Sequence, residues 1–151
     1  MKTREVRFDG DLQLVIPDDD RFTWPAGSVL EFPFCCGPEK WNTKFYIFDK
    51  LFGVRISPAC FVHDVMWEIC DATWGDFHYS NSVFLHNVLN IVNMRSEVGF
   101  LRFLRRHKAF AYYDAIDIGG AKHFWEYKAS QGFDISEQKR GKNHGKGTSH
   151  S

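Results

Sequence analysis

Near the start of the chain, apolar and polar residues alternate, as in a β-strand with one buried face. Residues 5–8 alternate in this way, an Asp-Gly pair after them provides a hairpin turn, and residues 12–16 form a second apolar segment. A third short strand is predicted over residues 21–24, where a proline ends the pattern. The N-terminal region is therefore expected to form a small antiparallel sheet.

The region that follows has no clear period. Residues 31–44 contain prolines and a glycine, which predicts an irregular loop. Residues 44–51 are rich in aromatic side chains, and their pattern fits a helix as well as a strand. The sequence leaves this second segment unassigned.

From Ser57 onward the apolar positions repeat every three to four residues, which is typical of amphipathic helices. The first helix is predicted over about residues 58–71. Ser57 is its expected N-cap because a serine oxygen can accept a free backbone N–H, and Pro58 suits the first turn because its missing N–H costs nothing there.

Two further helices are predicted, one starting near Ser80 and one spanning residues 96–118 with Gly119 and Gly120 as its C-cap. Six residues of the third helix are expected to share its buried face: Phe100, Phe103, Leu104, Phe110, Ala111 and Ala115. The predicted fold class is α+β, a small N-terminal antiparallel sheet followed by three or four packed helices. One globular domain is expected over residues 1–136.

Composition narrows the possible partners. The chain has 151 residues, of which 44% are hydrophobic, enough for one core. The 19 basic and 19 acidic residues cancel, so nucleic acid is an unfavoured partner and the basic residues of the third helix are interpreted as a solvated face. No transmembrane segment or signal sequence is apparent. Residues 137–151 are polar and rich in glycine and lysine, which predicts a flexible basic tail.

The four cysteines are expected to be free, buried thiols. Cys60 and Cys70 would lie about 15 Å apart along one helix, too far for a mutual disulfide, and Cys35 and Cys36 are neighbours in the sequence. The spacing of cysteines and histidines matches no local zinc motif, so no structural metal is expected.

The main chemical signal is the adjacent pair His63 and Asp64 on an otherwise apolar helix. Two ionisable residues in such a setting cost free energy unless each has a partner. In one interpretation His63 is a general base that deprotonates a water and Asp64 is an oxygen ligand for a cation such as Ca²⁺. In the other, which is commoner for such a dipeptide, the pair is a buried structural hydrogen-bond node.

Asn81 is the third candidate because it lies on the apolar stripe of the second helix. If the first two helices pack antiparallel, its amide can both donate to and accept from His63 or Asp64 and orient the imidazole. The alternative is that Asn81 caps the start of the second helix. The candidate catalytic residues are thus His63 and Asn81, and the candidate metal ligand is Asp64.

Four groups of residues follow one another along the chain in a characteristic order. They are Pro25-Ala26-Gly27, the Ala-x-x-x-His-Asp of residues 59–64, the helix of residues 81–89, and Tyr113-Asp114-Ala115-Ile116 followed by Gly120 and Trp125. Over residues 12–125 the chain resembles the family called domain of unknown function 1353, which is common in tailed phages and prophages. The resemblance implies a structural or accessory protein without a cofactor. It also implies synthesis in the host cytoplasm, incorporation into a virion, and other phage or host proteins as partners.

Residues 58–64 are also similar to the Cys-x-x-His-Asp helix of phospholipases A2. This second resemblance implies that His63 activates water, Asp64 binds calcium, and Asn81 stands where an acid would orient the histidine. A fragment around Gly37 is the only upstream candidate for a calcium loop. Calcium as cofactor and lipid as substrate are expected only under this alternative. A third alternative is regulatory binding to a host protein through exposed aromatic residues.

Overall fold

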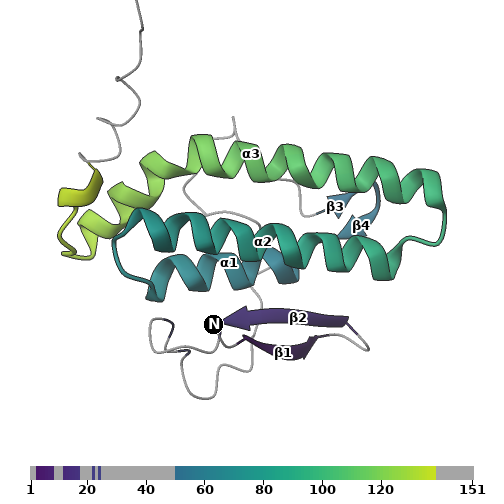
Figure 1. Ribbon diagram of the computed structural model, residues 1–151, viewed down its shortest axis with the longest axis horizontal. Coiled ribbons are helices and arrows are strands. Elements are labelled where there is room, and N and C mark those ends of the chain that lie inside the picture. The colour runs from purple at the N-terminus through teal and green to yellow at the C-terminus, as the bar shows by residue number, and fades with distance from the viewer. Residues whose placement is uncertain (1–2, 9–11, 18–21, 23, 25–49, 139–151) are drawn as a thin grey trace, which may run out of the picture.

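The computed structural model describes residues 3–8, 12–17, 22, 24 and 50–138 (Figure 1). Its elements are, in order, β1 (Thr3–Phe8), β2 (Leu12–Pro17), β3 (Lys50–Leu51), β4 (Val54–Arg55), α1 (Ser57–Ile69), α2 (Trp74–Arg95) and α3 (Gly99–Ser130). A short helical segment follows at residues 136–138. The predicted α+β class, with an antiparallel sheet before the helices, is confirmed.

The predicted N-terminal hairpin is present. β1 and β2 pair antiparallel, with Thr3 opposite Pro17 and Phe8 opposite Leu12. In β2 the alternate residues Leu12, Leu14 and Ile16 are buried. This alternation turns one face of the hairpin toward the helices, where it lies on the side of α1 and α2 opposite α3 (Figure 1).

The segment left unassigned by the sequence ends in a strand. Residues 50–51 form β3, which pairs antiparallel with β4 through a tight turn at Phe52 and Gly53, both with positive φ. Of the predicted third strand, Phe22 and Trp24 are described and neither is in a strand. The predicted loop at residues 31–44 lies outside the described residues.

The first helix matches its prediction except at its cap. α1 begins at Ser57, the N-cap position is occupied by Ile56, and no side chain caps the helix. The backbone carbonyl of Ile56 instead accepts from the N–H groups of Ala59 and Cys60. Ser57 is therefore the first helical residue, and the prediction that it is the N-cap is wrong. Pro58 does lie in the first turn.

The second helix begins earlier than predicted, at Trp74 rather than near Ser80. Thr73 is its N-cap: the Thr73 hydroxyl accepts from the Asp76 N–H at 3.0 Å and donates to the Asp76 carboxylate at 2.9 Å. This Thr-x-x-Asp arrangement is a capping-box signal in the sequence. The aromatic residues after Thr73 are thus helical.

The third helix does not stop at Gly119 and Gly120 but continues to Ser130. Gly120 is buried, and a Cβ atom there would come within 3.0 Å of the Trp67 ring on α1. Position 120 requires a glycine because the Trp67 ring of α1 comes close to the α3 backbone there. The prediction that Gly119 and Gly120 form a C-cap is therefore wrong.

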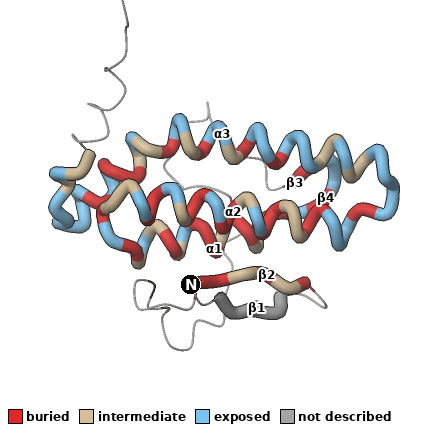
Figure 2. The backbone as a smooth tube through the Cα atoms, viewed as in Figure 1, coloured by how far each residue is buried: buried red, intermediate tan, exposed pale blue. Residues whose placement is uncertain are grey.

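The predicted buried face of α3 is also wrong. Phe100, Phe103 and Phe110 are exposed, as are Ala111 and Ala115, and Leu104 is only half-buried. The buried residues of α3 are Ala109, Tyr112, Ile116, Gly120, Phe124, Trp125 and Lys128. Figure 2 shows this face turned toward α2 and the opposite face open to solvent. α3 has apolar residues on two sides, and the packing against α2 decides which side is buried.

The core lies between the hairpin and the three helices. Its centre is aromatic: the Trp67 ring lies 5.6 Å from Phe77 and 5.5 Å from Phe124, centroid to centroid. None of the helices in the described part of the chain has the length and apolarity needed to cross a membrane.

Candidate functional site

His63 lies on the buried face of α1, where it points toward α2. Only 5% of the residue is exposed. Its imidazole contacts two aromatic rings, Trp67 at 4.6 Å and Phe84 at 5.3 Å between centroids. These rings exclude water, so the polar atoms of the imidazole need partners within the protein.

The predicted partner is present. His63 Nε2 lies 2.9 Å from Asn81 Oδ1, and Asn81 is fully buried on α2. Because α2 begins at Trp74, Asn81 lies well inside the helix and cannot cap it. The capping alternative is therefore wrong, and the expected contact between His63 and Asn81 is confirmed.

Asp117 on α3 extends this contact to a third helix. The Asn81 Nδ2 group donates to Asp117 Oδ1 at 3.0 Å. A carboxylate only accepts, so this bond requires the amide nitrogen to face Asp117 and the amide oxygen to face His63. His63 Nε2 must then carry a hydrogen, and the lone pair of the neutral imidazole is on Nδ1.

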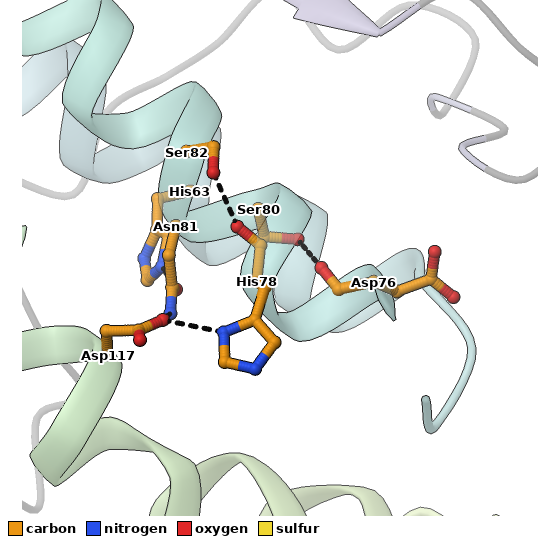
Figure 3. Close-up of polar contacts among 7 residues, drawn as sticks. All are labelled: His63, Asp76, His78, Ser80, Asn81, Ser82 and Asp117. Carbon is orange, nitrogen blue, oxygen red and sulfur yellow. Dashed lines mark hydrogen bonds and ion pairs between the residues drawn. The ribbon is translucent and has the colours of Figure 1, made fainter. Parts of the chain in front are cut away.

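The chain of contacts ends at the surface. His78, one turn before Asn81 on α2, donates through Nδ1 to Asp117 Oδ1 at 2.8 Å. The His78 side chain is 52% exposed, and its ring stacks on that of Trp74. We call His63, Asn81, Asp117 and His78 the polar network (Figure 3). It links α1, α2 and α3 and runs from the core to solvent.

Two members of this network, His78 and Asp117, were not predicted from the sequence. His78 and Asn81 lie three residues apart and so share one side of α2, a spacing that could have paired them. Asp117 had no such signal, because its partners are distant in the chain and the packing of α3 on α2 brings them together.

Asp64, the candidate calcium ligand, lies at the edge of this site. Its Oδ1 atom is 3.5 Å from His63 Nδ1, and its side chain is 46% exposed. That distance is too long for a good hydrogen bond. Among the described residues no three His, Cys, Asp or Glu side chains form a group that could hold a metal ion. The fragment around Gly37 lies outside them.

The cysteines differ from expectation. Cys60 is disulfide-bonded, and its partner lies outside the described residues, so the prediction of a free thiol is wrong for this residue. Cys70 is free and buried, as predicted. Burial raises the pKa of the Cys70 thiol to about 11, so the thiol is protonated and unreactive near neutral pH.

Lys128 is an unexpected buried cation beside Cys70. Its Nζ group donates to the backbone carbonyls of Glu68, at 3.2 Å, and of Cys70. These carbonyls lie at the C-terminal end of α1, where a cation also interacts favourably with the helix dipole. Burial lowers the pKa of Lys128. A lysine from α3 thus caps α1.

Comparisons with protein-family models, with curated proteins and with solved structures gave no significant match to this chain. The phage-family and phospholipase resemblances therefore stay predictions from the sequence.

Proposed function

We propose that the chain is a structural or accessory protein of a tailed phage or prophage, in which the polar network fixes the packing of three helices. The phage context is supported by the sequence resemblance over residues 12–125. The structural role is supported by one observation above the others: Asn81 is fully buried and bonds to His63 on α1 and Asp117 on α3 through its two amide ends.

Such an arrangement stabilises one particular packing. A buried polar group left without a partner costs on the order of 1–3 kcal/mol. If either α1 or α3 shifted along α2, an amide end of Asn81 would lose its partner. The network therefore favours one helix register over others, which apolar contacts alone specify less strictly.

The test compares His63→Ala with Ser82→Ala. His63→Ala removes the buried end of the network and should lower the melting temperature by several degrees. Ser82 is exposed on the same helix as Asn81, and its hydroxyl bonds only the His78 carbonyl at 2.9 Å, so Ser82→Ala is a matched control with little expected effect. A His63→Ala variant as stable as the wild type would contradict the structural role.

The second candidate function is a calcium-dependent, phospholipase A2-like hydrolase. It is favoured by a specific observation. The Asn81 amide oxygen accepts from His63 Nε2 and so fixes the imidazole hydrogen on that nitrogen, and the amide nitrogen of Asn81 donates to the negatively charged Asp117 carboxylate. The lone pair on Nδ1 is then next to Asp64, as a general base beside a cation ligand would be.

This candidate requires calcium binding as well as turnover. Millimolar calcium should raise the melting temperature of the wild type, because a ligand that prefers the folded state stabilises it, and Asp64→Asn should abolish the rise. Wild-type protein should release fatty acid from phospholipid vesicles, and the His63→Ala variant should not. If wild-type protein shows neither effect, the hydrolase is rejected.

A further inference from the structure

α3 carries a second apolar face, turned away from the core. Its members are exposed and spaced three or four residues apart: Phe100 (68% exposed), Phe103 (62%), Phe110 (47%) and Ile118 (83%), with His107, Ala111 and Asp114 in line between them. We call these seven residues the α3 stripe. The ring centroids of Phe103 and His107 lie 6.3 Å apart, which is consistent with both residues lying on one side of α3.

The spacing of the α3 stripe is that of a helix-pairing seam. Side chains that recur alternately after three and four residues stay on one side of a helix, and another helix can pack along them. From Phe100 to Ile118 the stripe runs about 27 Å along the axis at 1.5 Å per residue. Exposed apolar faces of this length are uncommon on monomers and mark interaction sites.

The charge along α3 is strongly asymmetric. From Gly99 to Tyr113 the helix has four cationic residues (Arg102, Arg105, Arg106 and Lys108) and no acid, a formal charge of +4. From Asp114 to Glu126 it has three acids (Asp114, Asp117 and Glu126) against Lys122, a formal charge of −2. Two copies of α3 would oppose like charges if parallel and unlike charges if antiparallel. Helix dipoles also favour the antiparallel arrangement.

We propose that the α3 stripe is a self-association surface, on which a second copy of this chain packs its own α3 antiparallel about a two-fold axis between residues 110 and 111. Residues equally far from this axis then face each other. Phe103 meets Ile118 of the second copy, His107 meets Asp114, and Phe110 meets Ala111. Large side chains thus face smaller ones, and the polar positions face each other, as a self-complementary interface requires.

Asp114 favours a second copy over a lipid surface. Inserting the α3 stripe into a bilayer would bury the Asp114 carboxylate among acyl chains without a partner, which is costly. In the two-fold arrangement the same carboxylate meets a histidine, and this pairing occurs twice.

The first test is sedimentation equilibrium of the full chain. Wild-type protein should be dimeric, and Phe103→Ser should shift it to a monomer of unchanged circular dichroism, since Phe103 contributes little to the core. Met94→Ser is the matched control, because Met94 is an exposed apolar residue on α2, outside the stripe, and should leave the dimer intact. A monomeric wild type at high micromolar concentration would overturn the proposal.

The second test fixes the orientation by oxidative cross-linking. The two copies of residue 111 lie beside the axis, so Ala111→Cys should form a disulfide-linked dimer. The two copies of residue 118 would be about 22 Å apart, so Ile118→Cys should not. Wild-type protein under the same oxidation controls for the native cysteines. Equal cross-linking at both positions indicates parallel pairing and overturns the proposal. The proposal is also overturned if wild-type protein is a monomer that co-sediments with anionic phospholipid vesicles and Phe103→Ser abolishes this co-sedimentation.

Discussion

At the residue scale, Asn81 gives His63 an acceptor and Asp117 a donor from a single uncharged side chain. We predict that Asn81→Asp destabilises the protein at neutral pH by about 2 kcal/mol or more, because two carboxylates would then lie about 3 Å apart in a buried site. The loss should shrink at acidic pH, where one carboxyl takes up a proton. Urea denaturation at several pH values measures this.

The double variant Asn81→Asp, Asp117→Asn is the control for that prediction. It exchanges the acid and the amide, which leaves one donor and one acceptor between α2 and α3. It should recover most of the lost unfolding free energy. If the double variant is as unstable as the single one, charge repulsion is not the cause.

Cys70 predicts a dependence of stability on alkaline pH. The pKa of its thiol is raised from 9.0 to about 11 by burial, so between these values the folded protein keeps a proton that the unfolded chain has lost. The unfolding free energy contributed by this thiol is therefore constant below pH 9 and falls as the pH rises to about 11.

Comparison with Cys70→Ala isolates this contribution. Burial lowers the pKa of the neighbouring Lys128, which adds the opposite trend; the variant keeps this burial but loses the opposing effect of the Cys70 thiol on Lys128. Relative to the variant, wild-type protein should lose about 1–3 kcal/mol across the alkaline range, as measured by chemical denaturation. Parallel curves for the two proteins would show that the thiol does not titrate in this way.

At the element scale, the adjacent glycines of α3 have opposite roles. A Cβ at position 119 would meet nothing within 4 Å, whereas one at position 120 would come within 3.0 Å of the Trp67 ring. Gly119→Ala should stabilise the helix by up to about 1 kcal/mol through helix propensity. Gly120→Ala should cost about 1–3 kcal/mol, since aromatic neighbours hold the Trp67 ring in place. A Gly120→Ala variant more stable than Gly119→Ala would contradict this packing.

A second prediction at this scale concerns the attachment of the hairpin to α2. The buried Asn87 amide accepts from the Val15 N–H and donates to the Val15 carbonyl, both at 2.8 Å, as a neighbouring strand would. Asn87→Ala should cost about 2–3 kcal/mol and accelerate hydrogen exchange at the Val15 amide, because both backbone groups lose their partner. Asn90 on the same helix is half-buried and its side-chain hydrogen bond, to His86, is exposed, so Asn90→Ala should change stability by less than about 0.5 kcal/mol.

At the scale of the whole molecule, the folded domain extends further than the predicted boundary at residue 136. Glu137 contacts the start of α2: its carboxylate accepts from the Trp74 backbone N–H at 3.3 Å, and its carbonyl accepts from Trp74 Nε1 at 2.9 Å. Removing residues 139–151 should leave the melting temperature unchanged. Removing residues 137–151 should lower it by several degrees, because the indole N–H loses its partner. Equal effects of the two truncations would contradict a role for Glu137.

The candidate site was only partly predictable from the sequence. His63 and Asp64 stood out because two ionisable residues on an otherwise apolar helix need partners, and Asn81 because it lies on the apolar stripe of the second helix. The contact between His63 and Asn81 followed from packing the two helices together. Asp117 could not be assigned to the same site, because α3 also has an exposed stripe and its orientation was open. His78 shares one side of α2 with Asn81, but its hydrogen bond to the site is made through Asp117. The wrong choice of buried face on α3 placed Phe103 in the core.

Local periodicity and turn chemistry determined the hairpin, the existence of three helices and the α+β class, because these depend on neighbours along the chain. The tertiary structure decided which apolar face of α3 is buried. It also decided that Gly120, inside α3, leaves room for the Trp67 ring, and that the Asn81 amide donates to the Asp117 carboxylate. These features depend on contacts between residues far apart in sequence. A helix with two apolar sides satisfies the local rules in either orientation, and only the shape and polarity of α1 and α2 distinguish them.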